Sequence, residues 1–171
     1  MTFNEVMFSG KGGTAGAIVK GLIPEQATSV LEIREYMVEG KLEALVPKTD
    51  RGVPGVILGA ELARSLGAKA GDLITAVSPL RTLDPDRWSA TPDVPATQTL
   101  EVVGVFRAGF QEYDARLAYM ALPAAQRFFA TGDTVVGIEV AVEDPLRAGV
   151  VAERIDAALG GEGYSVLDWR R

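Results

Sequence analysis

The chain has 171 residues, enough for one domain or two small lobes. Its hydrophobic fraction of 47% predicts a packed core, and its net charge of −6 argues against a nucleic-acid surface, which needs basic residues. The absence of cysteine and histidine excludes disulfides, thiolate nucleophiles, cysteine–zinc sites and a Ser-His-Asp triad.

Taken in chain order, the hydrophobic pattern predicts alternating strands and short helices. Two short strands flank the glycine-rich residues 10–13, which are typical of a turn. Residues 42–46 fit no single class, and residues 111–114 are expected to form a polar turn. Strands are predicted at residues 3–8, 15–19, 53–58, 72–78, 100–106, 117–122, 134–142 and 164–167, and helices at residues 27–38, 61–66, 124–130 and 145–159.

Several helix ends carry recognisable signals. Gly67 follows a short helix at the position where a left-handed residue commonly ends one. Pro123 fits the first turn of the next helix, and Asp144 before Pro145 is typical of a helix N-cap. Together the elements predict an α+β fold with mixed sheets and short βαβ units.

A long connection broken by prolines separates the strands at residues 72–78 and 100–106. This arm spans residues 79–95, whereas hairpin loops usually have about two to five residues. Its prolines fix φ and remove backbone donors, so they stiffen the arm and keep it out of the sheet. Trp88 near its middle has two interpretations: an anchor for a binding partner, or a cover for the edge of the core.

Candidate chemistry is sparse. Residues 9–16 resemble a phosphate-binding loop, but Gly16 and Ala17 stand where the second lysine and the hydroxyl residue are needed, which favours a plain turn. Glu112 and Asp114 are a carboxylate pair of the kind that can divide acid and base roles. We interpret them as a solvated turn with Tyr113 packing inward, and a small carboxylate enzyme is the rival hypothesis. No catalytic residue, metal site or cofactor is predicted.

The chain contains no run of 18 apolar residues, so no segment is predicted to span a bilayer. Residues 1–10 lack the basic and apolar regions of a signal peptide. We expect both ends to be cut from something larger.

A series of short motifs, taken in chain order, resembles a known family over nearly the whole chain. The series resembles the extracytoplasmic domain of the LolC/LolE-type permease subunits of the lipoprotein-releasing ABC transporter, within the MacB-like superfamily. The motifs are Val56-Ile57-Leu58-Gly59, Glu61-Leu62-Ala63, Leu66-Gly67, Gly71-Asp72, Val102-Val103-Gly104-Val105-Phe106, Gly109, Glu112-Tyr113-Asp114, Ala118-Tyr119, Ala125-Gln126, Gly137-Ile138-Glu139-Val140, Asp144-Pro145 and Asp168-Trp169.

The resemblance implies a non-enzymatic domain on the periplasmic side of the bacterial inner membrane, between two transmembrane helices. It implies a porter-like lobe, which we place at residues 51–171, and a second, Sabre-like lobe, of which residues 1–50 would be a truncated part. In the family, lipoproteins pass to the chaperone LolA, a second permease subunit completes the transporter, and a separate cytoplasmic subunit hydrolyses ATP. No nucleic acid is expected as a partner.

The resemblance also implies binding residues. The family's chaperone-docking hook corresponds to residues 79–95, with Pro79, Leu83, Trp88, Pro92, Asp93, Val94 and Pro95 as contact residues. The neighbouring pad corresponds to Thr75, Thr97 and Gln98. The arm is longer than in the family pattern, Asp93 and Val94 replace a methionine-bearing tip, and the pad lacks arginine. A LolC-like, LolE-like or hybrid subunit therefore stays open, as does another MacB/FtsX-like permease with a different partner.

Overall fold

A computed structural model describes residues 1–27, 33–47, 52–78, 95–160 and 163–168. The chain divides into two compact units, Met1–Ile138 and Glu139–Arg171. Among the helices of the described residues, none is long and apolar enough to cross a membrane.

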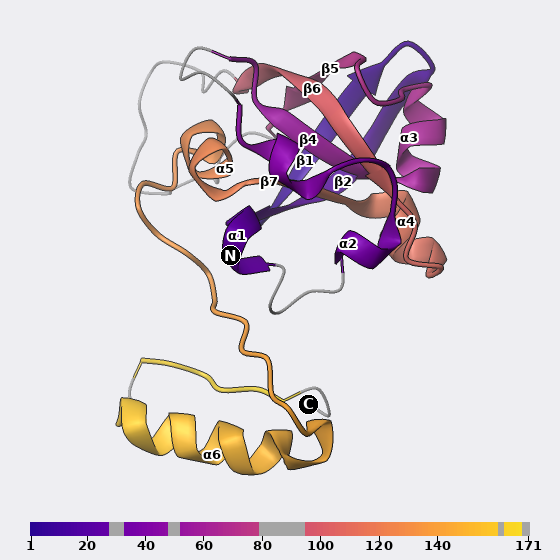
Figure 1. The fold of residues 1–171 in the computed structure, drawn as a ribbon. Helices are drawn as coiled ribbons and strands as arrows, with labels where there is room; N and C mark the ends of the chain where they lie inside the picture. The colour runs from indigo at the N-terminus through magenta and orange to yellow at the C-terminus, as the bar shows by residue number, and fades with distance from the viewer. Residues whose placement is uncertain (28–32, 48–51, 79–94, 161–162, 169–171) are drawn as a thin grey trace, which may run out of the picture. The chain divides into compact units, whose positions relative to one another are not determined.

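The first unit is built on one mixed sheet that closes on itself (Figure 1). The strand order is β3-β6-β4-β7-β2-β1-β5, and an additional pairing of β5 with β6 closes a ring of six strands. The pairs β2–β7 and β4–β6 are parallel, whereas β1–β2, β1–β5, β4–β7 and β5–β6 are antiparallel. The strands are β1 (Thr2–Gly10), β2 (Gly13–Leu22), β3 (Met37–Gly40), β4 (Gly55–Gly59), β5 (Leu73–Val77), β6 (Thr97–Phe106) and β7 (Leu117–Ala121).

Short helices pack against this barrel. The helix α3 contacts β1, β2, β4 and β6, while α5 contacts β1, β2 and β7 (Figure 1). The helical elements of the first unit are α1 (Pro24–Ala27), α2 (Ile33–Tyr36), η1 (Leu42–Leu45), α3 (Ala60–Leu66), α4 (Gln111–Arg116) and α5 (Leu122–Phe129). The mixture of helices and one mixed sheet confirms the α+β class.

The core lies inside the barrel, as the alternation of side chains along the strands requires. Val6 and Phe8 of β1 are buried, whereas Phe3 and Met7 on the opposite face of the same strand are exposed. Every residue of β4 is buried, which fits a strand with neighbours on both edges and both faces covered.

The glycine-rich turn between β1 and β2 is confirmed as a hairpin turn, and it lies against the end of α3. Gly10 pairs with Gly13 across the hairpin. The backbone N–H of Gly12 donates to the carbonyl oxygen of Leu66 at 2.8 Å. Gly67 ends α3 with φ of 60°, as its position in the sequence predicts. The glycines therefore allow the backbone of the hairpin turn to lie close to the backbone at the end of α3.

Two local predictions in the first unit are wrong. Within the predicted helix 27–38, residues 37 and 38 belong to β3, which pairs with the second half of β6; here an available sheet edge overrides the helical pattern. Residues 111–114 are not a polar turn but the start of α4. Asp114 is buried, and Tyr113 is 56% exposed rather than packed inward.

The lobe boundary predicted after residue 50 falls inside the first unit. The strands β3 and β4 lie on either side of it in sequence, and both pair with β6 in one sheet. The assignment of residues 1–50 and 51–171 to Sabre-like and porter-like lobes stays a prediction.

The second unit contains η2 (Pro145–Arg147) and α6 (Ala148–Leu159). The Asp144 side chain accepts a hydrogen bond from the Leu146 N–H at 3.0 Å, which confirms the predicted N-cap. The runs at residues 134–142 and 164–167 were predicted as strands, and neither is in a strand of the structure. A β-branched sequence supplies strand propensity, but a strand also needs a partner to complete its hydrogen bonds.

Candidate functional site

The candidate site begins where β5 and β6 meet at the base of the arm. The two strands pair antiparallel from Leu73↔Glu101 to Val77↔Thr97. Beyond this ladder the Ser78 N–H donates to the carbonyl oxygen of Ala96 at 2.9 Å, and Ser78 is buried. Ser78 and Ala96, on either side of the predicted arm, therefore lie side by side at the end of the β5–β6 ladder. The antiparallel pairing of the two strands that flank the predicted arm is confirmed, and residues 79–94 of the arm lie outside the described residues.

The outer face of the barrel beside this base carries two cross-strand rows, which we call the outer rows. One row is Met7–Val77–Thr97 and the other is Ser9–Thr75–Thr99, read across β1, β5 and β6. Met7 is 47% exposed, and Thr97 and Thr99 are exposed. None of these six side chains carries a charge, so the outer rows form a neutral surface of threonine, serine and aliphatic groups.

Gln98 lies on the other face of β6 from Thr97 and Thr99. It pairs with Ala76, and its face of the strand also carries the fully buried Leu100, so its side chain points into the barrel. Its Oε1 atom is buried and has no hydrogen-bond partner among the described residues. The structure therefore brings Thr75 and Thr97 together and separates Gln98 from them.

Of the predicted contact residues in the arm, only Pro95 lies in the described part of the chain. Pro95 is exposed and lies two residues before β6. The other predicted contact residues, Pro79, Leu83, Trp88, Pro92, Asp93 and Val94, lie outside the described residues.

Sequence reasoning missed Met7, Val77 and Thr99 as neighbours of the predicted pad. The alternation within β5 and β6 was available as a signal for Val77 and Thr99, because residues two apart share a face with Thr75 or Thr97. Met7 could not be found in this way, because its position depends on the pairing of β1 with β5 across more than sixty residues of sequence.

An ion pair lies near the start of β5. The Lys11 ammonium contacts Asp72 at 3.0 Å, and the Lys69 N–H donates to the same carboxylate at 3.0 Å. The Lys69 N–H, followed by Lys11, lowers the pKa of Asp72 below its ordinary value. The pairing joins the hairpin turn to the turn before β5, and so supports the register of the strands that carry the outer rows.

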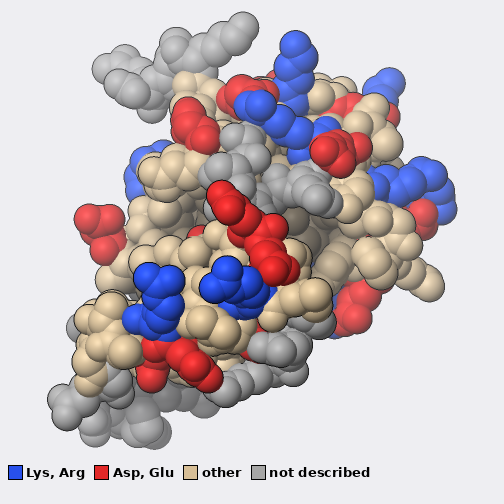
Figure 2. Space-filling view, turned by 60° about the horizontal axis from the view of Figure 1, so that its bottom comes forward, with Lys and Arg blue, Asp and Glu red and all other residues tan. Residues whose placement is uncertain are grey.

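Charged side chains elsewhere are mixed rather than gathered by sign. On the face that Figure 2 shows, lysine and arginine side chains lie beside aspartate and glutamate. Arg34 and Glu43 form an ion pair, and a backbone hydrogen bond, followed by Arg34, lowers the pKa of Glu43. This pattern gives no basic stripe on that face of the kind that a phosphate backbone requires.

The carboxylate pair considered as an enzyme site has a structural role instead. Asp114 accepts hydrogen bonds from the backbone N–H groups of Ala108 at 2.7 Å and Gly109 at 3.2 Å. Glu112 and Tyr113 are exposed, and the ring of Tyr113 packs edge-on against Phe110. Asp114 is therefore engaged in holding the loop before α4.

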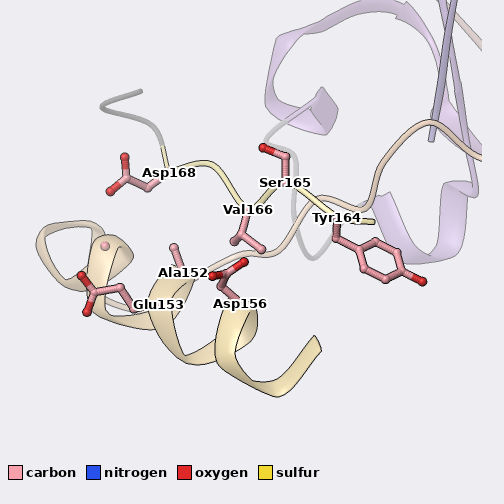
Figure 3. Close-up of a pocket in the computed structure, with 8 residues that line it drawn as sticks. Ala152, Glu153, Asp156, Tyr164, Ser165, Val166 and Asp168 are labelled. Atoms are coloured by element: carbon pink, nitrogen blue, oxygen red, sulfur yellow. The ribbon is translucent and has the colours of Figure 1, made fainter. Parts of the chain in front are cut away.

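A groove of about 570 Å³ lies in the second unit between α6 and the segment that follows it (Figure 3). Figure 3 shows the Tyr164 hydroxyl directed away from the carboxylates of Glu153 and Asp168. Among the described residues, no group of three or more acidic side chains is placed to hold a metal ion. The lining residues are Gly149, Ala152, Glu153, Asp156, Tyr164, Ser165, Val166 and Asp168.

The fold and the site together define a mixed β-barrel domain with a neutral outer face beside the end of the β5–β6 ladder. A model of the MacB-like periplasmic core domain matches residues 2–158, and the chain belongs to this family.

Two curated relatives extend the comparison. The chain is 27% identical over 166 residues to the lipoprotein-releasing system transmembrane protein LolC of Neisseria meningitidis serogroup B, covering 97% of this chain and 38% of the relative. It is 28% identical over 155 residues to the protein of the same name from Xylella fastidiosa, covering 91% of this chain and 35% of the relative. The predicted resemblance to the periplasmic domain of LolC/LolE-type subunits is thereby confirmed. The chain spans less than two fifths of the length of these relatives.

Proposed function

We propose that this chain is the periplasmic domain of an inner-membrane lipoprotein-releasing ABC transporter permease, and that it binds a LolA-like chaperone during lipoprotein transfer. In the whole transporter a second permease subunit would complete the membrane part, and a separate cytoplasmic subunit would hydrolyse ATP. Membership of the MacB-like family and the similarity to two LolC proteins support the transporter assignment.

The observation that carries the chaperone-binding proposal is the base of the arm. Ser78 and Ala96 are held together by a backbone hydrogen bond at the end of the β5–β6 ladder. A two-residue turn would be enough to join strands in this arrangement. Lengthening a turn about tenfold costs only about 2 kcal/mol of closure entropy, so a long arm is tolerated where a partner uses it.

The outer rows supply the second part of the proposed surface. Thr75, Thr97 and Met7 face outward near the end of the β5–β6 ladder. We assign Thr75 and Thr97 to the docking pad, and we remove Gln98 from it because its side chain points into the barrel. Within the arm, Trp88 is the proposed anchor, with Leu83, Val94 and the neighbouring Pro79, Pro92, Asp93 and Pro95 as further contacts.

A pull-down with a LolA-like chaperone tests the proposal. The intact chain is compared with a variant in which residues 80–94 are replaced by Asn-Gly, which leaves a four-residue link of Pro79, Asn, Gly and Pro95 between the paired residues Ser78 and Ala96. The intact chain is expected to retain the chaperone and the shortened variant to lose it. A Tyr113→Ala variant, which removes an exposed aromatic ring from α4, serves as the matched control and is expected to bind normally. Equal retention by the intact and shortened chains would reject the assignment of the arm.

A second candidate is the periplasmic domain of another MacB/FtsX-like permease with a different periplasmic partner. The absence of any charged side chain among the six residues of the outer rows favours it, because the family's pad carries basic residues. Identification of the protein that co-purifies with the full-length permease separates the two candidates.

A further inference from the structure

The strand β1 has an open stretch along one of its edges. Gly10 and Gly13 close the two-residue turn between β1 and β2, so they form a hydrogen-bonded pair. Such pairs recur at every second residue of an antiparallel ladder, and the even-numbered residues of β1 therefore bond to β2. The backbone N–H and C=O groups of the odd-numbered residues point to the opposite edge of the strand.

The described residues pair with both ends of this opposite edge. From Met7 onward the edge pairs with β5. At the other end, Met1 exchanges backbone hydrogen bonds of 2.9 and 3.1 Å with residues 136–137. Between these ends, the N–H and C=O groups of Phe3 and Glu5 have no backbone partner among the described residues. We call residues 2–6 of this edge the open stretch.

The sequence explains why β5 does not continue along the open stretch. In the register of the β1–β5 pairing, the residue that would come opposite Glu5 is the second after Val77, which is Pro79. Proline has no N–H to donate to the Glu5 carbonyl oxygen. Asn4 faces the barrel interior but is only half-buried, whereas Val6 on the same face is 4% exposed. Solvent therefore reaches the inner face of β1 beside the open stretch.

The dimensions of the open stretch restrict what can pair with it. Five residues extend over about 17 Å, at roughly 3.4 Å per residue. The β1 strand of a second copy is too long, because it runs over Thr2–Gly10 and would collide with the residues that already pair at both ends. A short extended segment of a different polypeptide fits, because its own backbone supplies the missing donors and acceptors, as in strand addition to a sheet edge.

The side chains around the open stretch indicate the chemistry of this segment. Phe3 and Met7 are 43% and 47% exposed. Glu5 between them is exposed and has no ion pair among the described residues. An apolar side chain opposite Phe3 and a lysine or arginine opposite Glu5 would complement the two positions.

The open stretch is continuous with the surface already assigned to a partner. Met7 ends the open stretch and also belongs to the outer rows, so a protein seated on the outer rows reaches Phe3 and Glu5 without a second docking surface. We propose that an extended segment of the LolA-like chaperone adds as a strand to the open stretch. This inference rests on the proposed function, and it adds the backbone of β1 to the contacts of the arm and the pad.

Amide hydrogen exchange tests the proposal without any substitution. In the free chain the amides of Phe3 and Glu5 are expected to exchange fast, while that of Asn4, which bonds to β2, is protected. Saturation with the chaperone should slow the Phe3 and Glu5 amides at least about tenfold. Slow exchange of both amides in the free chain would overturn the proposal, because the edge would already be covered.

Two further outcomes separate this inference from the proposed function. If the chaperone binds and the Phe3 and Glu5 amides stay unprotected, strand addition is rejected and the proposed function stands. If the chaperone does not bind the intact chain, the proposed function is rejected, and the assignment of the open stretch to this partner is rejected with it.

A proline substitution tests the backbone contact directly. Glu5→Pro removes an N–H that points away from β2, and proline is tolerated at such edge positions. Glu5→Ala is the matched control, because it removes the same carboxylate and keeps the N–H. Titration calorimetry with the chaperone is expected to give a dissociation constant at least about fivefold higher for Glu5→Pro than for Glu5→Ala, the effect of one lost hydrogen bond. Equal constants in two folded variants would overturn the proposal. If Glu5→Pro does not fold, the exchange measurement on the unchanged chain decides.

Discussion

The packing of the hairpin turn against α3 makes Gly12→Ala a demanding test of the barrel. A Cβ atom at Gly12 would lie 2.7 Å from the nitrogen of Gly67 and 2.9 Å from the carbonyl carbon of Leu66. Both are backbone atoms, so no rotation of a side chain can relieve the overlap. Any shift of the turn also stretches the hydrogen bond from the Gly12 N–H to Leu66.

Two contributions set the size of the effect. Overpacking of this kind typically costs about 1–3 kcal/mol, and a weakened hydrogen bond costs about 0.5–1.5 kcal/mol. The free energy of unfolding is therefore expected to fall by about 3 kcal/mol. For a chain of this size the midpoint of thermal unfolding would fall by roughly 6–12 °C.

Urea unfolding followed by circular dichroism measures the difference, with Gly16→Ala as the matched control. A Cβ at Gly16 meets no heavy atom within 4 Å, so the control is expected to stay within about 0.5 kcal/mol of the parent chain. Equal stability of the two variants would refute the close packing of the turn on α3. A loss of phosphate-ligand affinity in Gly12→Ala without a loss of stability would instead favour the phosphate-loop interpretation.

Three further changes test other parts of the structure. Gln98→Leu removes a buried oxygen that has no hydrogen-bond partner in the described part of the chain, and it should stabilise the barrel by about 1 kcal/mol in urea unfolding; a destabilised variant would contradict its inward placement. Asp114→Ala leaves the two loop N–H groups without their carboxylate and should cost about 2–4 kcal/mol, whereas an unchanged midpoint would refute that role. Lys11→Met should raise the pKa of Asp72 only in part, because the Lys69 N–H remains, and NMR titration of the carboxylate measures this. The lowered pKa of Asp72 stabilises the fold at neutral pH, and this stabilisation is lost as the pH falls through that pKa. The variant should therefore begin to lose the stabilisation at a higher pH than the parent chain.

Local signals were enough to predict many elements of the first unit. The short spacing of the glycines at residues 10–13 predicted the β1–β2 hairpin, and Gly67 predicted the end of α3. The strand-like runs on either side of residues 79–95 predicted the antiparallel strands β5 and β6. Each of these features depends on residues close together in the sequence, where turn chemistry and capping are decisive.

Features that depend on distant pairing were not predictable in the same way. The closure of the barrel needs β5 to pair with both β1 and β6, and no local sequence pattern predicts the β1–β5 pairing. The outer position of Met7 and the inward position of Gln98 follow from that closure. At residues 134–142 the sequence pattern was that of a strand, but the run is in no strand of the structure. Strand propensity alone was therefore a poor guide there.

The binding affinity for a LolA-like chaperone, measured by titration calorimetry, tests the central claim most directly. The intact chain and the variant with residues 80–94 replaced by Asn-Gly are titrated in parallel, and unfolding midpoints confirm that both are folded. If the arm carries the anchor, its removal should weaken binding by at least about 30-fold, the effect of losing one hot spot of about 2 kcal/mol. The same dissociation constant for both chains would contradict the claim that this arm engages the chaperone.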